Sequence, residues 1–280
     1  MGLDTQTVRS TVDHWRQSQR LRLVAISTTM YLVGTLLINR AALTVGIPLD
    51  ASTGFVLALG VVFGPTVAIG AGLGYVFTDL LTGTFGLHSA FGYAAAFLLV
   101  FVAVAYWNTL DNHIPLERGR WDFVQFVVAA TPAVLTASTV EAWGADLLVR
   151  APFATVFLNS LGGTVGGVAV GLAALPIVRY LSGIGSLVRT ASPSSEPVFP
   201  KRWAITVAVV PALWGVFGTL LSVAFQPLQL EYPQILANRF GWTALTIVDL
   251  VGPAGRNAQF LLGLLGFTLL TLAVGSVRRS

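Results

Sequence analysis

The chain is divided into about eight apolar runs, and its positive charges lie mainly at every second boundary between them. The runs cover approximately residues 21–39, 51–63, 66–81, 88–107, 123–140, 153–181, 203–225 and 260–277. If the N-terminus is cytoplasmic and every run crosses a bilayer, 12 of the 16 Lys and Arg residues fall in segments on the inner side. This bias follows the positive-inside rule and predicts that both termini are cytoplasmic.

The composition argues against a water-soluble domain. Hydrophobic residues make up 55% of the 280 residues and charged residues only 10%, whereas soluble domains carry about 25% charged residues. We therefore expect an all-α integral membrane protein of the cell membrane, a bundle of about six spans followed by two further spans. The net charge of +4 does not indicate nucleic-acid binding, because the excess cations lie where they meet anionic lipid headgroups.

The apolar runs and a Ser/Pro-rich stretch suggest four units. Val8, Val12 and Trp15 recur at helical spacing, so the first unit is either an amphipathic helix on the inner membrane surface or a solvated tail. The third unit is a cytoplasmic linker, and the fourth contains an outer segment, 226–257, that is re-entrant or lies on the surface. The predicted units are residues 1–20, 21–181, 182–201 and 202–280.

Several polar residues are expected at a similar depth in the outer half of the bundle. Asp79 lies 14 residues after Pro65, about 21 Å along a helix. An ionisable group at membrane depth is costly and usually faces a cavity or a partner. The alternatives are a structural ion pair, an ordinary polar membrane edge, or a hydrogen bond between helices. The candidate solute-binding residues are Asp79, Asn159, Tyr93, His88, Glu141, Asn39 and Asp50.

Enzyme signatures are missing from the sequence. It contains no Walker A loop, HExxH or GxSxG motif and no cysteine, and its three His are spread over both predicted faces of the membrane. We expect no catalytic residue, metal or cofactor, and the protein is not expected to be an enzyme. With no ATP site in the chain, active transport would need a partner.

Residues 46–83 hold a series of features in one order: Pro48 in an exposed link, a short apolar helix, a Gly64-Pro65 turn, and a Gly-rich helix containing Asp79. This order resembles the substrate-binding S components of energy-coupling factor (ECF) transporters. Residues 151–181 are similar to the last helix of that fold. The resemblance covers residues 21–181, and the last 80 or so residues have no counterpart in a minimal S component.

The resemblance implies a protein that binds a vitamin, a precursor or a metal from outside and works with a transmembrane T component and two ATPases. It also implies that small residues contact the T component, although Ala spacing on the first helix departs from the family pattern. Glycines spaced by four residues let helices approach closely, and they pack either inside the bundle or against a partner. The candidate partner-interface residues are Ala25, Thr29, Gly70, Gly74, Gly163, Gly167 and Gly171.

The expected function is therefore a membrane-embedded, solute-binding subunit of an ATP-driven uptake transporter. The main alternative is a membrane sensor, anchoring or structural subunit that does not transport. A membrane enzyme acting on lipid and a secondary transporter are weaker alternatives, because no nucleophile, metal site or inverted repeat is visible. Acids outnumber bases among the candidate residues, which favours a cationic or hydrogen-bonding solute.

Overall fold

The computed structural model describes residues 5–47, 49–110, 119–149, 151–184, 197–225 and 256–279. It confirms an all-α, multi-pass membrane protein, because six helices are long and apolar enough to cross a membrane. The helices are α1 (Thr5–Val33), η1 (Gly34–Asn39), α2 (Arg40–Thr44), α3 (Ala51–Phe63), α4 (Thr66–Thr82), α5 (His88–Leu110), α6 (Arg120–Leu148), α7 (Phe153–Ile184), α8 (Lys201–Phe225) and α11 (Arg256–Gly275). Two strands of two residues, β1 (Pro197–Val198) and β2 (Arg278–Arg279), pair antiparallel.

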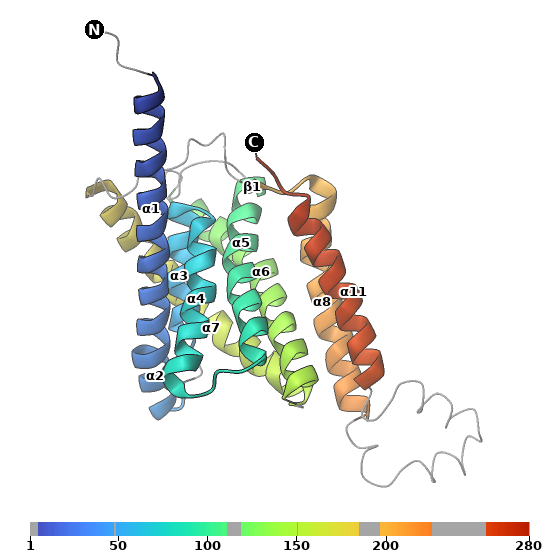
Figure 1. The fold of residues 1–280 in the computed structure, drawn as a ribbon. Coiled ribbons are helices and arrows are strands. Elements are labelled where there is room, and N and C mark those ends of the chain that lie inside the picture. Colours follow the sequence, from blue (N-terminus) through green and yellow to red (C-terminus); the bar gives the residue numbers. More distant parts are fainter. Residues whose placement is uncertain are drawn as a thin grey trace, which may run out of the picture.

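The two chain termini lie at the same end of the bundle, which we call the terminal end (Figure 1). The opposite end, where α3 begins after Asp50, is called the Asp50 end. The first helix projects beyond the bundle at the terminal end and continues through η1 and α2 to Thr44. The sequence predicted that the first apolar run ends at residue 39 and that an exposed link follows. In the structure, helix continues for five more residues, Arg40–Thr44. The π-helical segment η1 widens the backbone beside α3, and such segments are frequent at functional sites.

Helices α3 and α4 are shorter than the about 20 residues needed to cross a membrane, and α3 lies in the interior of the bundle. Gly64 adopts φ 89° at the end of α3, and Pro65 precedes α4. This confirms the predicted Gly-Pro turn, because a positive φ is accessible to Gly at little cost. Val56 and Ala58 of α3 are fully buried. Since α1, α5 and α7 surround α3, its short length is shielded by longer neighbours.

Helices α8 and α11 pair with each other and pack on α6 (Figure 1). Trp143 of α6 contacts Trp214 of α8 at 5.6 Å and Phe267 of α11 at 5.8 Å between ring centroids. The hydroxyl of Ser222 accepts a hydrogen bond of 3.2 Å from the backbone N–H of Ala154 in α7. The C-terminal helices are therefore joined to the preceding helices, α6 above all, by side-chain packing.

Residues 197–200, which precede α8, lie at the terminal end of the bundle (Figure 1). Phe199 is buried there, and its backbone N–H donates to Thr109 Oγ1 at 3.0 Å. Most of the predicted linker, residues 185–196, and most of the predicted outer segment, residues 226–255, lie outside the described residues.

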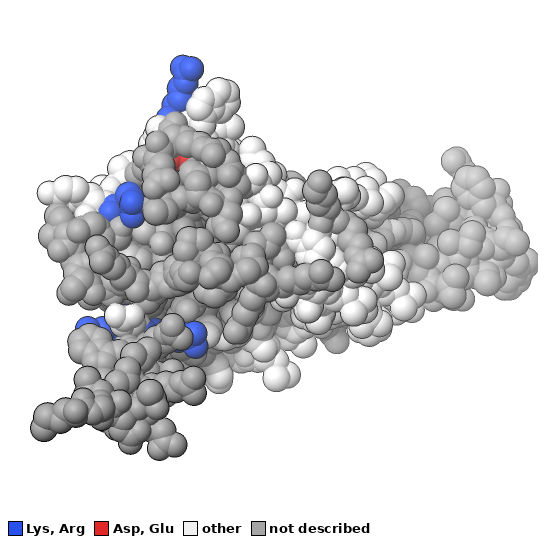
Figure 2. Space-filling view, turned by 90° about the horizontal axis from the view of Figure 1, so that it is seen from above, with Lys and Arg blue, Asp and Glu red and all other residues white. Residues whose placement is uncertain are grey.

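The charged side chains that the structure describes are divided between the two ends. Figure 2 shows Lys and Arg side chains at the periphery of the terminal end. Of the five arginines with described side chains, Arg20, Arg22, Arg120 and Arg179 belong to helix segments at that end, and Arg40 belongs to the Asp50 end. The uneven charge distribution expected from the sequence is thus present in the described part of the fold.

Candidate functional site

A polar cavity of about 60 Å³ lies inside the bundle, towards the Asp50 end. Tyr75, Glu141 and Ser160 each lie seven residues from the helix terminus at that end, which is about 10 Å along each helix. One glycine, three alanines and one leucine complete the wall and leave room for the polar groups. The described polar residues that line the cavity are Tyr31, Asp50, Thr53, Tyr75, Glu141, Ser160 and Thr164.

Glu141 is the central acid of this cavity. It projects from α6, and its Oε2 accepts a hydrogen bond of 2.7 Å from Ser160 Oγ of α7. Neither His, Lys nor Arg is among the described residues that line the cavity, and no ion pair joins Glu141 to a described basic residue. An acid at this depth is costly unless a partner or water compensates it. The cavity wall therefore holds two carboxyl groups, Asp50 and Glu141, and no basic side chain from the described part of the chain.

Asp50 contributes to the same wall but is held by its own helix. It is the N-cap of α3, where Oδ2 accepts from Thr53 Oγ1 at 2.5 Å and Oδ1 accepts from the hydroxyl of Ser52. Asn39 Nδ2 donates to Oδ1 at 2.9 Å, and Asn39 Oδ1 accepts from the N–H of Ala51 at 2.6 Å. Both oxygens of Asp50 are thus occupied, and Asn39 stabilises this cap.

The two tyrosines of the cavity are placed by glycines on the facing helices. The rings of Tyr31 and Tyr75 lie 6.3 Å apart with an interplanar angle of 52°. A Cβ at Gly74 would lie 2.6 Å from Tyr31 Cβ, and a Cβ at Gly92 would overlap the Tyr75 ring. The glycines of α4 and α5 therefore let two aromatic rings enter the bundle beside Glu141.

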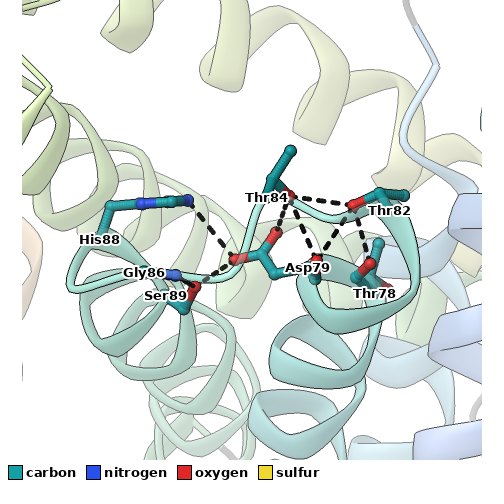
Figure 3. A network of polar contacts seen from close by, with 7 residues as sticks. All are labelled: Thr78, Asp79, Thr82, Thr84, Gly86, His88 and Ser89. Atoms are coloured by element: carbon teal, nitrogen blue, oxygen red, sulfur yellow. Dashed lines mark hydrogen bonds and ion pairs between the residues drawn. The ribbon is translucent and has the colours of Figure 1, made fainter.

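Asp79 lies in a separate cluster that organises the turn between α4 and α5 (Figure 3). Its Oδ2 accepts from Ser89 Oγ at 2.6 Å, and its Oδ1 accepts from Thr84 Oγ1 at 3.2 Å. His88 Nε2 lies 3.7 Å from Oδ2, and the N–H of Gly86 donates to Ser89 Oγ at 3.1 Å. Asp79 is 9% exposed and does not line the cavity. By accepting hydrogen bonds from Thr84 and Ser89, Asp79 holds the end of α4 to the start of α5.

The remaining predicted binding residues lie outside the cavity wall. Tyr93 packs against Gly72 and stacks on Phe97, with ring centroids 6.3 Å apart. Asn159 is exposed on α7, although the next residue, Ser160, faces the cavity. The sequence placed Asp79, Tyr93 and Asn159 around one cavity because their depths agree. Depth alone does not fix the rotation of each helix, and none of these three side chains lines this cavity.

Most of the glycines proposed as partner contacts are in contact with other helices of the same chain. A Cβ at Gly167 would overlap the carbonyl oxygen of Asp50, and one at Gly171 would lie 2.9 Å from Gly54 O. The carbonyl of Gly163 accepts a hydrogen bond of 3.0 Å from the N–H of Asp50. The sequence left open whether these glycines of α7 pack inside the bundle or against a partner. In the structure they pack inside the bundle, against α3 and the residue that precedes it.

Of the other four proposed partner contacts, two pack inside the bundle and two are exposed. Gly70 and Gly74 of α4 pack on α1, where a Cβ would overlap Ser27 or approach Tyr31. Ala25 and Thr29 are exposed on α1. These two positions therefore keep a surface that is available to another molecule.

Five polar lining residues were not singled out by sequence reasoning: Tyr31, Thr53, Tyr75, Ser160 and Thr164. The signal available for the tyrosines was a polar hydroxyl in the middle of an apolar run. The hydroxyl residues gave no such signal, because Ser and Thr in membrane helices commonly bond their own backbone. In the described part of the chain, no group of three or more Asp, Glu or His is arranged to hold a metal ion.

Comparisons with known proteins give no relative for this chain. No protein-family model matches the sequence, and no curated protein or solved structure gives a significant match. The functional argument therefore rests on the site itself.

Proposed function

We propose that this protein is a membrane-embedded solute-binding subunit and that the Glu141 cavity is its binding site. The observation that carries the proposal is a partly enclosed cavity whose wall combines two acids, Ser and Thr hydroxyls and two tyrosine rings, with Glu141, the hydroxyls and the rings contributed by five helices. A few convergent polar groups within an apolar shell are typical of small-molecule sites. The volume of about 60 Å³ favours a solute of a few non-hydrogen atoms over one of the size of a vitamin.

Uptake of that solute would need an energy source outside this chain, because the sequence contains no ATP-binding motif. We propose a transmembrane T component and two ATPases as partners, in line with the resemblance to S components. The exposed positions Ala25 and Thr29 on α1 support a docking surface there. A subunit that does not transport is the second candidate, and the internal use of the glycine ridges favours it, since less small-residue surface remains for a partner.

Purification from the native host in a mild detergent, followed by mass spectrometry, tests the transporter proposal. We expect one membrane protein and two ATPases to accompany the wild-type chain. A double variant, Ala25→Phe with Thr29→Phe, should lose them because bulky rings would separate the two surfaces. Val165→Phe, on the exposed face of α7, is the matched control and should retain them. Recovery of another membrane complex without ATPases would instead support a sensory or anchoring subunit.

For the orientation we propose a plasma-membrane protein with both termini in the cytoplasm. The support is the excess of arginines at the terminal end among the described side chains. In a bacterial host, alkaline phosphatase fused after Ser280 should be inactive and green fluorescent protein at the same position should fluoresce. Phosphatase fused after Gly83, at the Asp50 end, should be active. An active phosphatase after Ser280 would contradict the orientation.

A further inference from the structure

We propose that the Glu141 cavity selects a small organic cation that carries N–H donors, of the alkylammonium or guanidinium type. This inference rests on the proposed function and specifies the class of solute. It begins from the composition of the described wall, which contains two carboxyl side chains and no basic one. Both oxygens of Asp50 are occupied by neighbouring groups, so Glu141 is the acid available to a solute.

The serine and threonine hydroxyls of the wall present acceptors to the cavity. Ser160 Oγ donates its proton to Glu141, and Thr164 Oγ1 donates to the carbonyl of Ser160 at 2.6 Å. Thr53 Oγ1 donates to Asp50. With these protons engaged, each oxygen keeps lone pairs that can accept a hydrogen bond. A solute rich in N–H donors fits these acceptors, whereas an anion would meet two carboxyl groups and no basic side chain among the described wall residues.

The tyrosine rings favour an organic cation. Tyr31 and Tyr75 come from α1 and α4 and lie 6.3 Å apart at an angle of 52°, so two aromatic rings bound the space next to the acid. Cations positioned over an aromatic face are attracted by the electrons of the ring, most strongly where water is excluded. A carboxylate beside two tyrosine rings is thus suited to an ammonium or guanidinium group.

Two pairs of probes of similar shape separate charge from size: guanidinium against urea, and methylammonium against methanol. Binding is measured by isothermal titration calorimetry and by the midpoint of thermal unfolding in detergent. Sodium chloride is added to the samples with neutral probes so that all samples have the same ionic strength. A response that any monovalent cation produces is then the same in each pair. We expect at least one cation to bind at least tenfold more tightly than its neutral analogue.

Three variants locate the binding. Glu141→Gln should weaken cation binding at least tenfold while keeping the side-chain shape. Asp79→Asn is the matched control, since it changes an acid outside the cavity, and it should bind as the wild type does. Ala137→Leu fills the cavity from α6 and should abolish binding, which gives a second test if Glu141→Gln does not fold.

The outcomes distinguish the two proposals. Cation binding that depends on Glu141 and on an open cavity supports both of them. Equal binding of urea and guanidinium, lost in Ala137→Leu, would overturn the selection of cations and leave the cavity as a solute site. If no probe binds to the wild-type protein, both the cation proposal and the assignment of this cavity as the binding site are overturned.

Discussion

Replacing Trp214 with alanine is expected to lower the free energy of unfolding by about 3–5 kcal/mol, the usual range for deleting a large buried aromatic side chain. Trp214 is 1% exposed and lies between Trp143 of α6 and Gly266 of α11. Its removal leaves a hole where three helices meet. Lipid chains cannot fill an internal hole of this kind, so the lost dispersion contacts are not replaced.

The measurement is reversible unfolding in mixed micelles, followed by circular dichroism as the denaturing detergent is increased. Leu213→Ala is the matched control, because Leu213 is the neighbouring residue on α8 and is 50% exposed. Its loss should cost little, since lipid replaces the side chain. Equal destabilisation by both substitutions would contradict the packing of α8 described above.

Gly54→Ala is expected to destabilise the protein by about 1–3 kcal/mol or more, the cost of overpacking a tight interior. A Cβ at Gly54 would overlap the carbonyl oxygen of Gly167 and lie 2.7 Å from the backbone nitrogen of Gly171. The obstacles are backbone atoms, so α3 and α7 must move apart. That movement would also displace Ser160 and Thr164, and we expect cation binding to weaken together with stability.

Gly162→Ala provides the control for Gly54→Ala. A Cβ at Gly162 would meet nothing within 4 Å, so alanine there should be neutral or stabilise the helix by up to about 1 kcal/mol. Both substitutions add one methyl group to a helical glycine, and only one adds it at a helix contact. The free energies of unfolding of the two variants are measured under the same conditions. Equal values would refute the close contact between α3 and α7.

Several features of the site were accessible from the sequence. Glu141, Asp50 and Asn39 were named as candidates because polar groups near one membrane depth are few, and the structure places all three at or beside the cavity. The Gly64-Pro65 turn was identified because these two residues restrict the backbone in a specific way. The role of Asp79 in the α4–α5 turn depends on Thr84 and Ser89, which sequence spacing does not single out.

The sequence by itself determined the class of protein and the helical hairpins. Apolar runs, sparse charges and turn residues specify helices in lipid, because an unpaired backbone polar group is too costly there. The tertiary structure alone decided which face of each helix is internal. In lipid both faces are apolar, so hydrophobicity does not set helix rotation, and the contacts of glycines with rings and backbone do. Those contacts bring Tyr31, Tyr75 and Glu141 together and turn Asn159 outward.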